Sequence, residues 1–491
     1  MERMIPTSPD AVGVVQAPST ELRRSALSAA FITLLVVSAA SPMSVVAGGF
    51  PLGIMLGDGA GTPALVLAAL VLLLLFSAGY TAMATCVTSS GGFYALVGRG
   101  LGGAAGGAAA MVALVGYVLL QFGLYGMLGA VVSEALHAQF GLGVPWWACS
   151  LVALATVAVF GYRQIDVSAR LLACLALAEF AVVIVLDGLI LSKGGAAGIT
   201  TVSFEPHIVA HGNPAIGLLF CFAAFVGFEA TTIYGEEAKD PKRSIPIATY
   251  AALLLIGCFY SFSLWCLVLG AGTDRVVATI TALSDPTNFV YELSDRYGGQ
   301  GLTTALRCVF VTSVYAGLVS FHNSTARYFF CMGREGLLPA GIGVTHPVYK
   351  SPHRASMVQN VLCVIVVLAF AAAGADPVLT LFAWFSNLAT VFVLVLMVAT
   401  SCAVPAYFRR EAQHRIGILR SVVLPGLSAL GLTAVLILAI ANFHVLTGAS
   451  RATSAELLVL LPIGALAGWL SARRLLRRAP ERYARIGQDR G

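Results

Sequence analysis

Two carboxylates, Glu179 and Glu229, lie inside long apolar segments of the chain. An ionisable group is costly inside a membrane, so each one implies a partner, a cavity or a bound proton. Glu229 is interpreted either as a group that takes up a proton or as a cap for freed backbone N–H groups. Glu179 is interpreted either as a proton-coupling group, with Ser320 as its expected neighbour, or as a neutral structural glutamic acid.

Helix-breaking residues interrupt two of the apolar segments near their middle. The first contains SAASPMSVVAGGFP, where Pro42 removes a backbone donor and clashes with the preceding turn. The other contains FAAFVGFEATTIYGEE, where Gly227 lies two residues before Glu229. A half-helix N-terminus offers N–H groups to an anion and a half-helix C-terminus offers carbonyls to a cation, so two breaks that meet would suit a zwitterion. The alternative is a pair of kinks that serve packing alone.

The composition defines the elements that must position these groups. Of 491 residues, 11% are charged and 58% are hydrophobic, whereas a soluble domain has about 25% charged residues. This excludes a water-soluble enzyme and predicts a polytopic membrane protein with twelve spans of roughly 20 residues or more. With the N-terminus inside, only five of the 29 basic residues fall outside. The bias places both termini in the cytoplasm. The expected location of the chain is the cell (inner) membrane.

Five regions are expected along the chain. Residues 1–24 form a disordered cytoplasmic leader, 25–191 a first group of five helices, 214–408 a second group of five, 422–476 two further helices, and 477–491 a basic cytoplasmic tail. The two breaks lie about 180 residues apart, and each opens a group of five spans. Because five is odd, the second group enters the bilayer in the opposite sense, which predicts an inverted repeat.

Several other functions find no support in the sequence. The ten cysteines lie singly without CxxC spacing, so they predict neither disulfides nor a metal site. The glycine-rich stretch 89–110 lacks the GK[ST] of a phosphate loop and is better explained by close helix contact. Basic residues lie in short loops and a tail, so no nucleic-acid partner is expected. No cofactor is expected either.

Three segments carry a resemblance to a known family. FAAFVGFEATTIYGEEAKDPKRSIPIA (222–248), HNSTARYFFCMGREGLLP (322–339) and GGFYALVGRGLG (91–102) are similar to signatures of the amino acid–polyamine–organocation (APC) permeases. The resemblance implies an all-α integral membrane fold of the LeuT-like type, with twelve transmembrane helices, a 5+5 inverted repeat and discontinuous helices one and six. One departure is that Pro42-Met43-Ser44-Val45-Val46 replaces the usual Gly-x-Gly element. Substrate identity therefore does not transfer.

The resemblance also implies where a substrate would bind. Its carboxylate would meet backbone N–H groups around the first break, its amino group would meet carbonyls of the sixth span, and an aromatic ring would close over it. The residues implied for this site are Ser41, Met43, Ser44, Val45, Val46, Ala47, Phe222, Ala223, Phe225 and Phe228.

Two further groups of residues have a functional and a structural interpretation each. Tyr117 and Gln121 share one helical face with Tyr125, which predicts either lining of the pathway or hydrogen bonding between helices. The acidic and basic residues that follow span six form either a solvated charge cluster or an inner gate made by Glu237, Asp240 and Arg243.

Glu179 reverses a family pattern. Many relatives carry a Lys nine residues after a basic residue in span five, whereas here Arg170 is followed by Glu179. The expected function is a secondary active transporter for an amino acid, coupled to H⁺ more readily than to Na⁺. Alternatives are an exchanger, an amine or polyamine transporter on the same fold, and a non-transporting membrane sensor. An intramembrane enzyme or a channel is not favoured, because no catalytic cluster or filter repeat appears.

Overall fold

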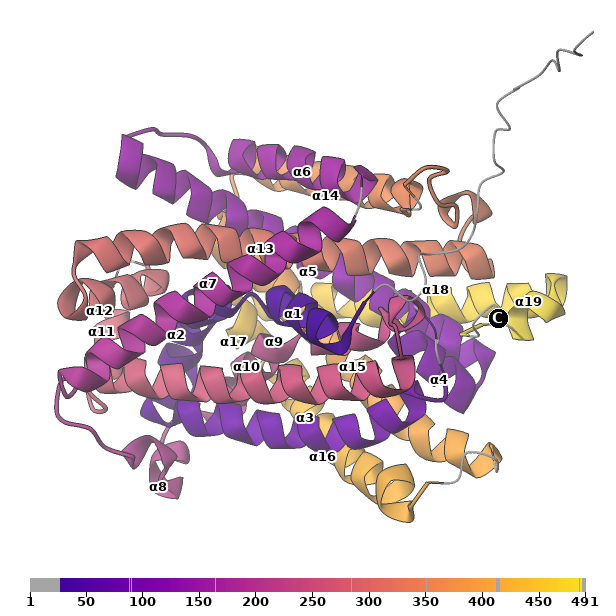
Figure 1. The fold of residues 1–491 in the computed structure, drawn as a ribbon, viewed down its shortest axis with the longest axis horizontal. Coiled ribbons are helices and arrows are strands. Elements are labelled where there is room, and N and C mark those ends of the chain that lie inside the picture. The colour runs from indigo at the N-terminus through magenta and orange to yellow at the C-terminus, as the bar shows by residue number, and fades with distance from the viewer. Residues whose placement is uncertain are drawn as a thin grey trace, which may run out of the picture.

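Long helices run side by side through the molecule, and short elements lie at both ends of the bundle (Figure 1). The computed structural model describes residues 27–87, 89, 91–163, 165–283, 285–349, 351–411, 416–484, 486 and 487, without the side chains of 163–173 and 236. The predicted leader 1–24, the Arg170 side chain and residues 488–491 of the predicted tail lie outside this description.

In the described part of the chain, the bundle contains ten long helices besides the two interrupted segments. They are α3 (Thr62–Ala84), α5 (Gly103–Phe140), α6 (Trp146–Arg163), α7 (Ile165–Ser192), α10 (Pro241–Ala271), α13 (Gln300–Glu335), α14 (His353–Ala372), α15 (Ala383–Arg410), α16 (Leu424–Ala441) and α18 (Arg451–Arg478).

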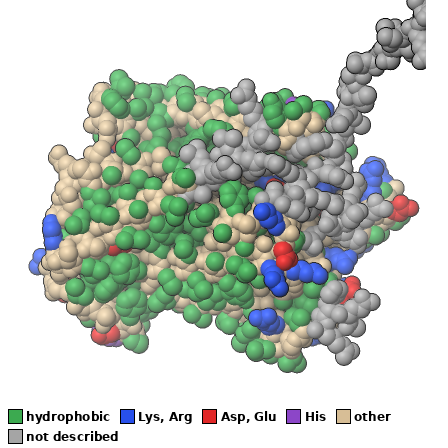
Figure 2. Space-filling model, viewed as in Figure 1, with side chains coloured by type: hydrophobic (Ala, Val, Ile, Leu, Met, Phe, Trp, Pro, Cys, Tyr) green, Lys and Arg blue, Asp and Glu red, His purple; other side chains and the backbone are tan. Residues whose placement is uncertain are grey.

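Apolar side chains cover the outer surface of the bundle (Figure 2). Among the described residues, ten stretches are long and apolar enough to cross a membrane, one of which runs through the first break from Ala29 to Ala84, and Trp146–Tyr162 is a shorter apolar helix. Val71, Ile184 and Leu430 are examples of large apolar residues that are more than half exposed. Such a surface suits lipid, so the predicted multi-pass membrane protein is confirmed.

The first interrupted segment breaks at the predicted residues. Helix α1 (Ala29–Ala40) ends at Ser41, whose φ of 46° is the only positive value of a non-glycine residue in the described part of the chain. Pro42 follows, and the segment resumes as η1 (Ser44–Gly49), α2 (Phe50–Gly53) and η2 (Ile54–Asp58). Because Pro42 has no N–H and Ser41 is left-handed, the helical hydrogen-bond ladder stops here.

The second interrupted segment breaks at the predicted glycine, next to the first. Helix α9 (Pro214–Phe225) gives way to Gly227 with φ 114°, followed by η5 (Phe228–Thr232) and η6 (Gly235–Glu237). A Cβ on Gly227 would lie 3.1 Å from the Phe321 ring and 3.4 Å from the Cβ of Ala39. The two interruptions therefore meet inside the bundle, which is the arrangement proposed from the sequence.

The two ends of the bundle carry different short elements, which give the ends their names here. The α4 face carries α4 (Phe93–Leu101) and α19 (Pro480–Ala484), and the α12 face carries α8 (Pro206–Val209), α11 (Val276–Thr281) and α12 (Phe289–Tyr297) (Figure 1). Helices α11 and α12 lie in the connection between α10 and α13.

Close packing of glycines holds the α4 face together. A Cβ on Gly106 of α5 would lie 2.7 Å from the Cα of Gly98 of α4, so the glycine-rich stretch serves helix contact as predicted. Ile486, near the end of the chain, is buried against both glycines. The next residue, Gly487, donates its N–H to Glu335 Oε1 at 3.3 Å. The predicted basic tail is thus partly a packed element.

Candidate functional site

A cavity of about 120 Å³ lies beside the two breaks. It is mainly apolar, and its polar groups come from the first break and from α15. It is lined by Ala39, Ala40, Ser41, Ser44, Val45, Gly49, Leu52, Leu120, Leu124, Phe220, Ala223, Ala224, Val226, Phe321, Phe382, Ala383, Ser386, Asn387, Thr390 and Leu446. Among the described residues, the lining contains no ionisable side chain, so the cavity itself is suited to a small solute with an apolar part.

Four of the residues predicted for the substrate site line this cavity: Ser41, Ser44, Val45 and Ala223. Six others do not, because the helical turn directs them to other sides of the same segments. They are Met43, Val46, Ala47, Phe222, Phe225 and Phe228, all buried in packing contacts. The expectation that Phe225 or Phe228 closes over the ligand is not met here, since Phe225 packs near Tyr260 and Phe228 packs near Phe76 and Tyr80.

The helix start after the first break is occupied by a carboxylate of the chain itself. Met43 donates its N–H to Glu179 Oε2 at 3.2 Å, and the Ser313 hydroxyl donates to the same oxygen at 2.6 Å. Ser44 donates its N–H to Ser313 Oγ at 3.3 Å. Ser44 is one of the residues, with Val45, Val46 and Ala47, whose N–H groups are expected to hold a substrate carboxylate. In this conformation the N–H of Ser44 is satisfied from α13 and that of Met43 from α7.

Ser313, and not the predicted Ser320, is the neighbour of Glu179. Besides its bond to Glu179, Ser313 accepts at its carbonyl a 2.8 Å hydrogen bond from the Ser41 hydroxyl. Ser320 lies seven residues further along α13, and its buried hydroxyl has no hydrogen-bond partner in the described structure. Two serines seven residues apart share a helix face, so the sequence offered no signal for choosing the correct one.

Glu229 caps the second break. Its Oε2 accepts the N–H of Gly227 at 2.9 Å, and its Oε1 accepts the Tyr117 hydroxyl at 2.5 Å. The Glu229 carbonyl also accepts the Tyr80 hydroxyl at 2.7 Å. The geometry matches the capping interpretation, because the carboxylate satisfies an N–H that the helix break releases. Glu229 does not line the cavity.

The polar stripe on α5 joins helices to one another. Tyr117 reaches Glu229, and Gln121 donates its Nε2 to the carbonyl of Leu318 at 2.8 Å. Neither residue lines the cavity, to which α5 contributes Leu120 and Leu124. Of the two interpretations of this stripe, the geometry matches interhelical hydrogen bonding.

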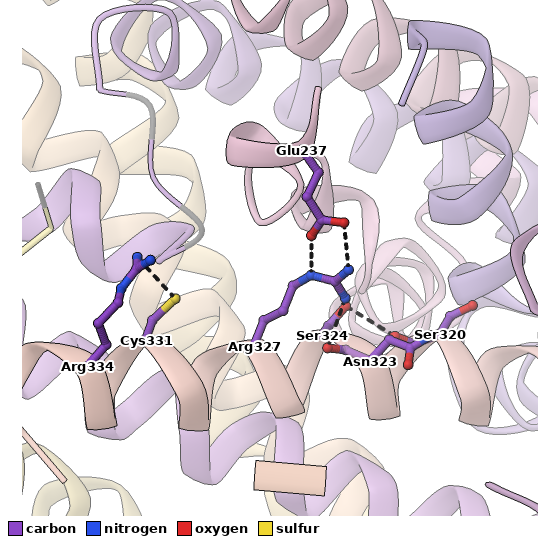
Figure 3. Close-up of polar contacts among 7 residues, drawn as sticks. All are labelled: Glu237, Ser320, Asn323, Ser324, Arg327, Cys331 and Arg334. Atoms are coloured by element: carbon purple, nitrogen blue, oxygen red, sulfur yellow. Dashed lines mark hydrogen bonds and ion pairs between the residues drawn. The ribbon is translucent and has the colours of Figure 1, made fainter. Parts of the chain in front are cut away.

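A buried ion pair replaces the predicted gate of Glu237, Asp240 and Arg243 (Figure 3). Arg327 of α13 donates its Nε to Glu237 Oε1 at 2.8 Å and its Nη2 to Oε2 at 3.1 Å. The guanidinium also lies 4.7 Å from the centre of the Tyr234 ring. Asp240 and Arg243 instead form a 4.0 Å pair at the surface, where their side chains are 56% and 85% exposed. The structure therefore pairs Glu237 with Arg327, whereas the sequence grouped it with Asp240 and Arg243.

Much of the cavity wall was not predicted. Phe220, Phe321, Phe382, Ser386 and Leu446 line it without having been singled out in the sequence. They come from four separate segments, because Phe382 and Ser386 lie on one continuous helical stretch, so only the tertiary structure brings them together. Their residue types are ordinary for membrane helices and carry no local signal.

Comparison with known proteins agrees with this architecture. A family model described as amino acid permease matches residues 43–472. The chain belongs to the amino acid permease family. The resemblance seen in its motifs is thereby confirmed, and the permease matches a family of transporters rather than of enzymes.

Two curated relatives match parts of the permease. The low-affinity putrescine importer PlaP of Escherichia coli (strain K12) is 24% identical over 242 residues, which are 48% of this chain and 52% of the importer. The branched-chain amino acid permease BcaP of Bacillus subtilis (strain 168) is 29% identical over 142 residues, 28% of each protein. The matched stretches thus span about half of these relatives' length or less.

A solved structure resembles the permease over almost its whole length. A mutant of the manganese transporter of Eremococcus coleocola superposes with a TM-score of 0.57 and covers 93% of this chain and 94% of its own. The sequences are 13% identical, so the likeness concerns the fold alone.

Proposed function

We propose that this permease is a secondary active transporter that carries an amino acid across the cell membrane by alternating access. The observation that carries the proposal is the meeting of two interrupted helices beside a small cavity. Helix interruptions at mid-depth expose backbone groups, which membrane proteins tolerate where they line a cavity. A rocking motion around these breaks would open the cavity to one side at a time.

The full topology belongs to the same proposal. We infer twelve spans, with a 5+5 inverted repeat in 25–191 and 214–408 and two further helices in 422–476. Basic residues such as Arg99, Arg243 and Arg410 lie on or near the α4 face, which supports its assignment as the cytoplasmic face by the positive-inside rule. Both termini would then lie in the cytoplasm, and the α12 face would be extracellular.

The cavity favours a neutral amino acid over a polyamine. An amine carried as a cation needs carboxylates or carbonyl clusters to replace its hydration, but the described lining holds only hydroxyl and amide side chains among its polar groups. The small volume and the walls from Leu120, Phe220 and Leu446 suit a compact apolar side chain. Putrescine remains the competing substrate because one relative is named for it.

Glu179 is the proposed site of proton coupling. Its carboxylate links the first break to α7 and α13 through Met43 and Ser313. Protonation removes the negative charge that these donors stabilise, so it weakens the link between the broken helix and its surroundings. A change in this link would shift the balance between the conformations that open the cavity to one side of the membrane or to the other. The Glu237–Arg327 pair is proposed as the inner gate that must separate when the cytoplasmic side opens.

Uptake into proteoliposomes tests the proposal. The purified full chain would be given radiolabelled leucine, alanine, serine, arginine and putrescine in turn, with an inward proton gradient, an inward sodium gradient or none. We expect accumulation of a neutral amino acid that the proton gradient stimulates. Stimulation by sodium alone would contradict proton coupling, exchange without any gradient effect would indicate an exchanger, and binding without uptake would indicate a sensor.

A further inference from the structure

A second carboxylate on α7, absent from the sequence-based site, is fully buried. Asp187 has 0% of its surface exposed. Its Oδ2 accepts the Ser263 hydroxyl of α10 at 2.6 Å, and its Oδ1 has no hydrogen-bond partner in the described structure. A carboxylate held by one hydroxyl is poorly compensated for the loss of water.

Asp187 lies on the α12-face side of Glu179. The two residues are eight positions apart on one helix, which is a rise of about 12 Å along its axis. Helix α10 packs against α7 along this stretch: Ser263 bonds to Asp187, and Tyr260, three residues earlier, lies within range of an electrostatic interaction with Glu179. The Tyr260 hydroxyl also donates to the carbonyl of Ala40, beside the first break, at 3.3 Å.

No cation compensates Asp187 in the described part of the molecule, because its only charge-stabilising contact there is the Ser263 hydroxyl. Helix α1, which packs against α7, contains no titratable residue, and on α10 the Cys266 thiol interacts electrostatically with Asp187. The remaining described titratable groups toward this end, on or next to α6, α7, α12 and α13, have contacts of their own. Lys193 donates to the Tyr297 carbonyl, the Tyr297 hydroxyl to the Gly270 carbonyl, and the Thr303 hydroxyl to Asp295. Arg296 pairs with Glu292, Arg307 pairs with Glu134 and lies over the Tyr291 ring, Cys308 is exposed, and Cys149 is buried.

We propose that Asp187 is a second proton-binding site, which accepts a proton from the extracellular side and passes it toward Glu179. The inference rests on the proton coupling proposed above. In the step, a proton from external water binds the Asp187 carboxylate; it later leaves through intervening water molecules to the Glu179 carboxylate, and Asp187 returns to its anionic form. Ser263 acts as a positioning residue that holds the Asp187 side chain by its hydrogen bond.

Substitution of Asp187 by Asn separates this role from a structural one. Asn can accept the Ser263 hydrogen bond but cannot carry a proton. We expect Asp187→Asn to lower proton-gradient stimulation of uptake by about tenfold, measured with the best substrate of the radiolabelled panel. Exchange without a gradient should stay within about twofold of wild type, since it needs no net proton movement.

Infrared difference spectra between about pH 5 and about pH 9 give a readout that does not depend on transport. The full chain in lipid should show a carboxyl C=O band that is absent in Asp187→Asn. Ser263→Ala should shift that band, because the hydrogen bond is lost. The matched control is Ser261→Ala on the same helix, whose buried hydroxyl bonds instead to the carbonyl of Pro63 at 2.9 Å and should leave the band in place.

Each other outcome overturns the inference in a distinguishable way. A wild-type protein that responds to the proton gradient, with an Asp187→Asn variant that responds equally, removes the role of Asp187 and leaves coupling at Glu179 standing. Loss of both uptake and exchange in Asp187→Asn would assign Asp187 to helix packing alone. A wild-type protein without any response to the proton gradient would overturn both proposals together.

Discussion

At the scale of single residues, Glu179 joins three elements with one carboxylate. Met43 and Ser313 donate to the same oxygen, so the charge is shared between the start of a half-helix and α13. The helix start carries a partial positive charge, which stabilises the anion there. The protein thus holds its own anion at the place where the sequence suggested that a substrate would supply one.

Replacement of Glu179 by Gln tests its coupling role. Gln keeps an oxygen for Met43 and Ser313 but cannot exchange a proton. In the wild type we expect uptake to rise as external pH falls, because protonation drives the cycle; in Glu179→Gln this dependence should be flat and gradient-driven uptake should fall about tenfold or more. Initial uptake rates across external pH measure this. Glu292→Gln, which removes a half-exposed charge paired with Arg296, should leave the profile as it is.

Glu229 gives a contrasting prediction. Glu229→Leu leaves the N–H of Gly227 and the hydroxyl of Tyr117 without an acceptor, at a cost of about 1–3 kcal/mol each. We expect loss of transport and a clearly lower melting temperature in detergent. Glu229→Gln keeps an acceptor and should retain most of the stability. Equal stability of the Leu variant and the wild type would contradict the capping role.

At the scale of elements, the ion pair between α13 and η6 joins two buried charged side chains. Removing one partner of a buried pair costs about 3–5 kcal/mol, because the other charge stays buried. Arg327→Ala should therefore lower the melting temperature and leave the cytoplasmic side of the transport pathway poorly closed. Thermal unfolding in detergent and substrate leak from loaded proteoliposomes measure the two effects.

Arg243→Ala is the control for Arg327→Ala. Arg243 is 85% exposed and sits 4.0 Å from Asp240, so its loss should change stability by no more than about 0.5 kcal/mol. A larger effect for Arg243 than for Arg327 would restore the gate that the sequence suggested.

The elements also show which features a sequence reveals. The breaks at Pro42 and Gly227 were predictable, because each follows from the backbone chemistry of one residue. The cavity wall from α15 and Leu446 was not, since ordinary side chains become a wall only when distant segments pack together. Arg327 was within a family motif but looked like any basic residue near a span end, and Asp187 was hidden in an apolar run near the end of α7.

At the scale of the whole molecule, the proposed orientation can be measured directly. In a variant without native cysteines, a single cysteine at Arg275 of the α12 face should react with a membrane-impermeant maleimide on intact cells. One at Arg410 should react only after permeabilisation. Both positions are exposed, so accessibility to solvent is not limiting. The reverse pattern would invert the topology and, with it, the direction of the proton path through Asp187.

The packing of the last described residues matters for handling the protein. Ile486 is buried against Gly98 and Gly106, and the Gly487 N–H donates a hydrogen bond to Glu335. Trimming the chain after Ala484 would remove the Ile486 side chain and expose the glycines that it covers, with a loss of about 1.5–3 kcal/mol in folding free energy. Purification tags and fluorescent reporters attached at this end of the chain would need a spacer long enough to leave Ile486 packed against Gly98 and Gly106.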